Sequence, residues 1–213
     1  NDLENKQPQV YQMLQNSIRK NRVAHAYLFE GERATGKKEA AILLAKSIFC
    51  EEADQGELAC NACTNCRRIS SGNHPDVHMI EPDGLSIKKE QIQMLQEEFS
   101  KKGVESNKKI YILADAEKMT VQAANSLLKF LEEPHAETTA ILLTEQPQKI
   151  LPTIQSRCQE ISFQPLSTSD IISKLQEQGV DLQRASIISH ITSRYEEAVE
   201  ISLDDWFAQA ERK

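Results

Sequence analysis

The sequence predicts an α/β fold, in which a parallel sheet is covered by helices on both faces and is followed by a small all-helical domain. Three observations predict it: short apolar runs typical of buried strands alternate with helical patterns, a glycine-rich loop follows the first run, and no strand-like run occurs after Pro165. Strands that alternate with helices form parallel sheets with both faces covered. A chain of 213 residues is long enough for one such domain and a small second one.

The individual elements can be placed from the apolar periodicity. The expected strands are Tyr27–Phe29, Val77–Ile80, Ile110–Ala114, Ala140–Thr144 and Gln159–Phe163. The expected helices between them are Lys37–Phe49, Lys88–Lys101, Thr120–Leu131 and a short one near Ile150–Ile154. Three further helices are expected after Pro165, namely Ser169–Gly179, Leu182–Ile191 and Glu196–Ala210. We therefore expect an α/β domain over residues 1–165 and a helical domain over residues 166–213.

Composition limits the classes of function. Hydrophobic residues make up 39% of the chain and charged residues 27%, which is typical of a soluble globular protein. The sequence contains neither an apolar run of membrane-spanning length nor a signal peptide, and its five cysteines then indicate the reducing cytoplasm. A net charge of −7 argues against wholesale nucleic-acid binding by the isolated chain. The chain begins at Asn1 rather than at a methionine, which indicates a fragment.

The glycine-rich loop is Gly31-Glu-Arg-Ala-Thr-Gly36-Lys37-Lys38, which matches the phosphate-loop pattern G-x-x-x-x-G-K-[S/T] except at its last position. In that pattern backbone amides surround phosphates, the lysine reaches the β- and γ-phosphates, and the final hydroxyl binds Mg²⁺. Lys38 cannot ligate Mg²⁺ and its charge repels the metal. Because the loop joins an expected strand to an expected helix, it points a helix N-terminus at an anion. The alternative is a simple glycine-containing turn.

A second nucleotide-handling element is expected at the end of the strand before Asp115. Phosphate-loop ATPases often hold Mg²⁺ with such an aspartate and polarise the attacking water with the next residue, a glutamate. Here Ala116 follows, and Glu117 is displaced by one position, which should turn its side chain to the opposite side. The alternative role of Asp115 is to cap the following helix. The departures here and in the loop together predict that ATP hydrolysis is lost.

Two polar residues at later strand ends are further candidates. Thr144 ends the fourth expected strand, where a hydroxyl could contact a γ-phosphate. Arg157, within Ser156-Arg157-Cys158, follows the short fourth helix and should lie at the rim of the domain. From there it could act in trans as an arginine finger, which stabilises the charge that develops in phosphoryl transfer. The alternative for Arg157 is an ordinary surface ion pair.

Four cysteines form a separate candidate site. Cys50, Cys60, Cys63 and Cys66 have the spacing C-x₉-C-x₂-C-x₂-C within a short stretch that we expect to be irregular. Four thiolates suit tetrahedral Zn²⁺, and a complete ligand set predicts a structural site. The polar segment between the first two cysteines could fold only with the free energy of metal binding. An iron–sulfur cluster and a disulfide pair are the alternatives. Cys158 stands apart and is expected to be a buried free thiol.

Together these motifs resemble the clamp-loader branch of the AAA+ ATPases. The residues that carry the resemblance are His25-Ala-Tyr-Leu-Phe, the four cysteines, the run from Ala124 through Asn125 to Pro134, and Ser156-Arg157-Cys158. The resemblance extends over nearly the whole chain. Motor subunits of that branch (gamma and tau) have an intact G-K-T and Asp-Glu, and this chain has neither. It therefore resembles a non-motor, stator subunit of the branch.

The resemblance implies a role in DNA replication, within a five-subunit ring of the DNA polymerase III holoenzyme that loads the sliding clamp onto primed DNA. It implies a phosphate-loop AAA+ sheet with an inserted zinc module at about residues 50–70, a helical lid domain, and a C-terminal collar domain outside this chain. The implied partners are the motor subunits (gamma and tau), the clamp-opening delta subunit and primed DNA, with no membrane. No intrinsic ATPase activity is implied.

The resemblance also assigns roles to residues. Arg157 is the implied arginine finger, and the four cysteines are the implied zinc ligands. The implied degenerate nucleotide site consists of Gly31, Gly36, Lys37, Lys38, Asp115 and Thr144. Motor subunits present a sensing arginine from the lid; here Glu196 is aligned with it and Arg194 lies close by.

Two other functions remain open. The chain could be a motor-type ATPase that binds or cleaves nucleotide, because Lys37 and the loop amides are intact. It could also be a stand-alone zinc-bearing DNA-binding module, which the net charge of −7 disfavours.

Overall fold

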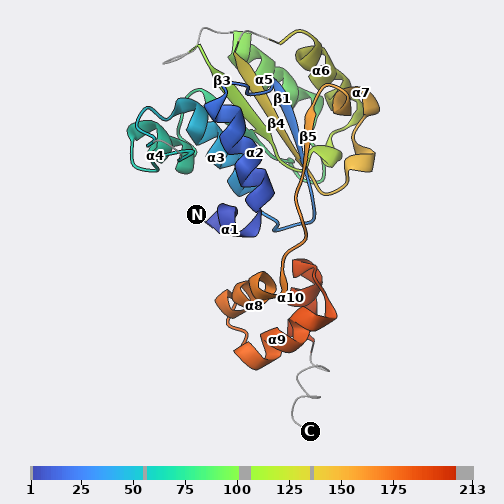
Figure 1. Ribbon diagram of the computed structural model, residues 1–213. Coiled ribbons are helices and arrows are strands. Elements are labelled where there is room, and N and C mark those ends of the chain that lie inside the picture. Colours follow the sequence, from blue (N-terminus) through green and yellow to red (C-terminus); the bar gives the residue numbers. More distant parts are fainter. Residues whose placement is uncertain (1, 55–56, 101–106, 135–136, 205–213) are drawn as a thin grey trace.

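The computed structural model describes residues 2–54, 57–100, 107–134 and 137–204 (Figure 1). Five strands form one parallel sheet in the order β2-β3-β4-β1-β5. They are β1 (Ala26–Glu30), β2 (Val77–Ile80), β3 (Lys109–Leu113), β4 (Thr138–Thr144) and β5 (Gln159–Ser162). All five expected strands are confirmed, with ends that differ by two residues at most.

Helices cover both faces of the sheet, as expected. One face carries α2 (Pro8–Arg19), α3 (Lys37–Phe49) and α4 (Thr64–Ser70), and the other carries α5 (Lys89–Ser100), α6 (Val121–Glu132) and α7 (Pro152–Gln155) (Figure 1). Because side chains alternate along a strand, β1 contributes to both cores. Tyr27 and Phe29 pack in the core on the side of α2, α3 and α4. Ala26 and Leu28 pack in the core on the side of α5, α6 and α7. All four are buried, as a central parallel strand requires.

The chain after Pro165 forms three helices, α8 (Thr168–Glu177), α9 (Leu182–Ile191) and α10 (Tyr195–Leu203). They enclose a small core of their own, made of Leu166, Ile171, Leu175, Ala185, Ile188 and Ala198. Figure 1 shows this group beyond the end of the sheet, on the side where α1 lies. The expected end of the last helix, Ala210, lies outside the described residues.

Three described helices were not expected from the sequence: α1 (Asp2–Lys6), α2 and α4. Pro8, at the first position of α2, is a residue type favoured there and was the available signal. The helix α4 corrects the expectation that the cysteine segment is irregular throughout. Short 3₁₀ turns, η1 (Ala116–Lys118) and η2 (Pro147–Lys149), follow β3 and β4. None of the described helices is both long and apolar enough to span a bilayer.

The order of the strands fixes where a site can form. The strand β1 lies between β4 and β5, so the chain must cross over it after β4. In open parallel sheets ligands bind beyond the carboxyl ends of the strands near such a reversal. Here the loop between β1 and α3 occupies this edge, next to the ends of β3 and β4.

Candidate functional site

The phosphate loop depends on its two glycines for different reasons. A Cβ atom on Gly31 would lie 2.8 Å from the Cβ atom of Phe163, so only glycine allows this close approach. Gly36 has φ +101°, in the left-handed region, and directly precedes α3. The loop therefore leads directly into the N-terminus of α3, as the motif predicted.

The motif lysine is bound by its own loop. Lys37 Nζ donates hydrogen bonds of 2.7 Å to the carbonyl oxygens of Gly31 and Glu32. Burial lowers the pKa of the Lys37 ammonium, and the carboxylates of Glu145 and Glu117 oppose this effect. The cation that would reach a phosphate is thus held by backbone carbonyls.

The departure from the motif, Lys38, is paired with an acidic residue. Its Nζ atom lies 3.1 Å from Oε1 of Glu81, the residue that follows β2. Both side chains are more than half exposed, so the pair contributes at most about 1 kcal/mol to stability. Glu81 was missed from the sequence; the only signal was an acidic residue directly after an expected strand. The pair places a protein cation where the motif would place a metal ligand.

A cavity of about 490 Å³ lies between the phosphate loop and the carboxyl ends of β2, β3 and β4. Its lining brings together five of the six expected nucleotide-site residues: Gly36, Lys37, Lys38, Asp115 and Thr144. Gly31 lies beneath the loop against Phe163. Four cations and five carboxylates share this lining, so the cavity is strongly polar: Arg33, Lys37, Lys38, Lys118, Glu39, Glu81, Asp115, Glu117 and Glu145.

The position of Glu117 corrects one expectation. The strand β3 ends at Leu113, and Asp115 has φ +51°, so strand alternation no longer applies at this point. The turn η1 brings Glu117 into the same cavity as Asp115, where its carboxylate accepts a 2.8 Å hydrogen bond from Thr144 Oγ1. Asp115 makes no side-chain cap to the described turn and lies 3.9 Å from Lys118 Nζ instead. The capping alternative for Asp115 is therefore wrong.

The helical group meets the phosphate loop through two crossed ion pairs. Arg33 Nη1 is hydrogen-bonded to Glu196 Oε1, and Arg194 Nε lies 3.9 Å from Glu32 Oε1. These four side chains line a cavity of about 230 Å³ together with Glu145. Burial raises the pKa of Glu145, and the charge of Lys37 opposes this. Glu196, the residue aligned with the sensing arginine, and its neighbour Arg194 therefore both contact the phosphate loop.

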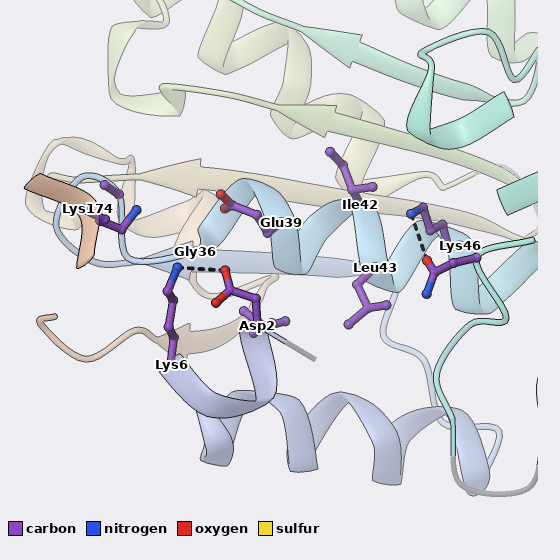
Figure 2. Close-up of a pocket in the computed structure, with 11 residues that line it drawn as sticks. Asp2, Lys6, Gly36, Glu39, Ile42, Leu43, Lys46 and Lys174 are labelled. Atoms are coloured by element: carbon purple, nitrogen blue, oxygen red, sulfur yellow. Dashed lines mark hydrogen bonds and ion pairs between the residues drawn. The ribbon is translucent and has the colours of Figure 1, made fainter. Parts of the chain in front are cut away.

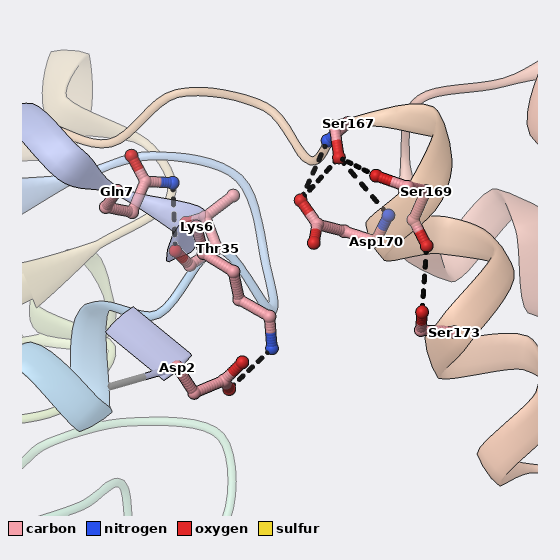
Figure 3. A network of polar contacts seen from close by, with 8 residues as sticks. All are labelled: Asp2, Lys6, Gln7, Thr35, Ser167, Ser169, Asp170 and Ser173. Atoms are coloured by element: carbon pink, nitrogen blue, oxygen red, sulfur yellow. Dashed lines mark hydrogen bonds and ion pairs between the residues drawn. The ribbon is translucent and has the colours of Figure 1, made fainter. Parts of the chain in front are cut away.

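A buried glutamine, which sequence reasoning missed, joins three parts of the chain. Gln7 is 2% exposed, and its Nε2 atom donates to the carbonyl oxygens of Thr35 at 3.0 Å and Gln164 at 2.8 Å. Its Oε1 atom accepts from the Gln164 amide at 3.0 Å. Figure 3 shows the bond to Thr35 beside the network at the start of α8. This residue ties α1, the loop and the segment leading to α8 together.

A third cavity, of about 260 Å³, lies on the other side of the loop between α1 and α3 (Figure 2). Two of its lysines have partners within it: Lys6 Nζ lies 2.7 Å from Asp2 Oδ2, and Lys46 Nζ donates to Asn61 Oδ1 at 3.0 Å. The second bond connects α3 to the cysteine segment. In this cavity α1, α3 and the cysteine segment meet, and these two lysines bind polar groups of the protein itself.

The four expected metal ligands come together. The Sγ atoms of Cys50, Cys60, Cys63 and Cys66 all lie within 4.8 Å of one another, and those of Cys60 and Cys66 are 4.0 Å apart. A tetrahedral zinc site with Zn–S bonds of 2.3 Å separates its sulfurs by about 3.8 Å. Cys158 lies elsewhere and is half-buried rather than buried; burial raises the pKa of its thiol to about 11.

Helix ends position these sulfurs. Cys50 is the C-cap of α3, and Cys63 is the N-cap of α4, which carries Cys66. Backbone amides of Ala62 and Cys63 donate to Cys60 Sγ and lower the pKa of that thiol to about 7. Burial raises the pKa of Cys66 to about 12, but a coordinated thiol is deprotonated by the metal itself. The donor set fits a structural ion held by four thiolates.

Arg157 lies at the amino ends of the strands, whereas the phosphate loop lies at their carboxyl ends. Its Nη2 atom lies 3.2 Å from Glu132 Oε1, and its side chain is 44% exposed. The register pairs Gln159 with Tyr27, so Arg157 is level with a position six residues before Gly31. At about 3.3 Å per residue this separates them by roughly 20 Å. Arg157 therefore cannot reach the cleft of its own chain.

Known proteins are similar to this chain in sequence and in fold. Residues 6–167 match the family model described as DNA polymerase III, delta subunit. The chain is 57% identical over 207 residues to the DNA polymerase III subunit delta' of Bacillus subtilis, which covers 97% of this chain and 62% of that protein. It is 37% identical to subunit delta' of Pseudomonas aeruginosa over 63% of this chain and 42% of that protein. Subunit tau of B. subtilis is 36% identical over 79% of this chain and 30% of its own length.

Solved structures support the fold alone. A gamma subunit-related protein of Thermotoga maritima superimposes with a TM-score of 0.57 at 23% identity, covering 90% of this chain and 57% of that one. The Holliday junction branch migration motor RuvB of the same organism gives 0.57 at 11% identity, covering 93% and 60%. The chain belongs to the family described as DNA polymerase III, delta subunit, and two of its relatives within DNA polymerase III are subunits delta'.

Proposed function

We propose that this chain is part of a non-hydrolysing subunit of the DNA polymerase III clamp loader, acts in DNA replication, and lends Arg157 to the ATP site of a neighbouring subunit. Its similarity to subunits delta' and tau supports that assembly. The proposed partners are motor subunits of the gamma and tau type, a clamp-opening delta subunit and primed DNA. The chain spans less than two thirds of the length of these relatives, so the activity of the whole protein is included in the proposal.

The observation that carries the proposal is the position of Arg157. Its guanidinium is half exposed and lies near the amino ends of the strands, away from the phosphate loop of its own chain. In this orientation the cation can approach only a phosphate bound by another molecule. An arginine supplied in trans to a γ-phosphate stabilises the transition state without taking part in nucleotide binding by its own chain.

The proposed loss of hydrolysis rests on two elements of the cleft. Lys38, paired with Glu81, stands where a hydroxyl would ligate Mg²⁺. The carboxylate of Glu117 accepts a hydrogen bond from Thr144, which competes with any role in orienting water. Ala116 supplies no polar group between Asp115 and Glu117. The metal would lack the hydroxyl ligand of the loop, and the attacking water would lack a carboxylate free to orient it.

Structural roles are proposed for the remaining parts. The four cysteines would hold one zinc ion, which fixes the segment between α3 and α4 rather than contributing chemistry. The helices α8, α9 and α10 would form a lid domain that begins after residue 165, and the crossed ion pairs would hold it against the loop.

The test is ATP turnover by a clamp loader reconstituted with the full-length protein. We expect Arg157→Ala to slow hydrolysis at the neighbouring site by about 10³-fold or more while the ring still assembles. Arg19→Ala removes an exposed arginine from α2 and serves as the matched control. Unchanged turnover in an assembled ring that carries Arg157→Ala would contradict the proposal.

A motor-type ATPase remains the second candidate, because Gly36 and Lys37 of the motif both line the cavity and directly precede and begin α3. The isolated protein should then hydrolyse ATP, and Lys37→Ala should abolish the turnover. We expect no turnover above background, whether or not Lys37 is present.

A further inference from the structure

We propose that Glu132 is a positioning residue for Arg157, holding the guanidinium in the direction from which it meets the neighbour's phosphate. This inference rests on the proposed role of Arg157 in trans. It arises from the ion pair between Arg157 Nη2 and Glu132 Oε1, which joins two segments 25 residues apart in the sequence.

The backbone beneath Arg157 is already fixed. Gln155 Nε2 donates 2.8 Å hydrogen bonds to the carbonyl oxygens of Pro147 and Ile150, and Ile154 is fully buried. The amide of Arg157 donates to Ile154 O at 3.0 Å. What remains free is the long side chain, and an arginine loses rotamer entropy when it is held in one conformation. A partner on the rigid neighbouring helix can restrict it before the phosphate arrives.

Glu132 has the right place for this task. It is the last residue of α6, a twelve-residue helix packed into the same core as α7. A helix C-terminus carries partial negative charge, which adds to the attraction of the carboxylate for a guanidinium. Arginine has five N–H donors, so one can bind Glu132 while others bind phosphate oxygens. The two side chains are 44% and 42% exposed, which leaves this face open to a neighbour.

The expected size of the effect follows from the exposure of the pair. Exposed ion pairs contribute about 0.2–1 kcal/mol, so losing the carboxylate charge should lower kcat at the neighbouring site by about 1.4- to 5-fold. KM for ATP should not change, because nucleotide binding belongs to the neighbour. Glu132→Gln keeps the size of the side chain and removes its charge. Glu133→Gln makes the same change one residue later and is the matched control.

The experiment measures kcat and KM of the reconstituted loader with Glu132→Gln, Glu133→Gln, Arg157→Ala and the double variant Glu132→Gln with Arg157→Ala. We expect Glu132→Gln to lower kcat alone, Glu133→Gln to have no effect, and the double variant to equal Arg157→Ala. A further loss in the double variant would show that Glu132 acts through the structure and would overturn the inference.

The two levels of the proposal fail differently. If Arg157→Ala slows turnover but Glu132→Gln does not, the positioning role is wrong and the arginine finger stands. If Arg157→Ala has no effect, both are wrong. Equal melting temperatures of the single variants would exclude misfolding as the cause of a loss.

Discussion

The cysteine cluster and the phosphate-loop cleft both match ligand-binding patterns in the sequence, but they differ in whether their functional groups already have partners within the protein. In the cluster, four sulfurs converge to within 4.8 Å, and backbone amides add partial positive charge from one side. In the cleft, each of the four lining cations already has a partner within the protein: Glu196, two loop carbonyls, Glu81 and Asp115.

This difference shows that a motif predicts where groups gather, while their existing partners decide what they can bind. Four thiolates brought together without a cation would repel one another, so a bound metal ion would stabilise their close approach. A cleft in which Lys37 binds carbonyls and Lys38 binds Glu81 has less to gain from a phosphate. The stability of the cysteine cluster should therefore depend strongly on a bound metal ion. The stability of the cleft should depend little on a bound phosphate.

Removing metal should have the largest effect. We expect about one Zn²⁺ per chain, and expect chelation to destabilise the cysteine segment by several kcal/mol, since zinc binding contributes on the order of 10 kcal/mol in small zinc peptides. Hydrogen exchange should increase between Cys50 and Cys66 while the strands of the sheet stay protected. Replacing Cys60 and Cys63 by serine should reproduce this, and Cys158→Ser should not. A metal-free protein of unchanged stability would remove the contrast between the two sites.

The loop backbone is the next point to test. Gly31→Ala should destabilise the protein by about 1–3 kcal/mol, because its new Cβ atom would lie 2.8 Å from the Phe163 Cβ atom and force a backbone shift. Gly84→Ala is the matched control, since no atom lies within 4 Å there and only its φ of +70° opposes the change. Urea unfolding measures both. A smaller cost for Gly31→Ala than for Gly84→Ala would mean that the loop is not held by this packing.

The sequence was sufficient for the five strands, most of the helices and the grouping of the four cysteines, because each depends on local periodicity or spacing. It was insufficient for α4, whose seven residues are too few to display a helical period. The expectation for Glu117 failed because the left-handed conformation of Asp115 ends strand alternation, and no residue type demands that conformation there. Such a turn becomes visible only in the backbone.

Contacts between distant residues were the other part that the sequence could not supply. Gln7 and Gln164 are 157 positions apart, and Arg33 and Glu196 are 163 apart. Neither glutamine belongs to a motif, and charged residues on an exposed face have many potential partners. Similarly, Glu132 stood inside the motif run that identified the family, but its contact with Arg157 depends on how α6 and α7 pack.

Restoring the motif hydroxyl tests the cleft directly. Lys38→Thr should improve the affinity for Mg·ATP by about tenfold, roughly 1.4 kcal/mol, because it removes a repelling cation and supplies a metal ligand. Lys38→Arg keeps the charge and the reach to Glu81 and serves as the control. Calorimetric titration in the presence and absence of Mg²⁺ distinguishes them. Equal affinity of wild type and Lys38→Thr would show that the lysine is not what distinguishes this cleft from a metal site.

The crossed ion pairs should have the smallest effect. Arg33→Ala and Glu196→Ala should be coupled by only about 0.2–1 kcal/mol in a double-mutant cycle of unfolding free energies, because both side chains are largely exposed and screened. The coupling should shrink as salt is raised from 0.05 to about 0.5 M, since the Debye length shortens. Lys6 and Asp2, an ion pair within α1, provide a reference cycle. A salt-independent coupling above about 2 kcal/mol would instead mean that the helical group and the loop form one buried unit.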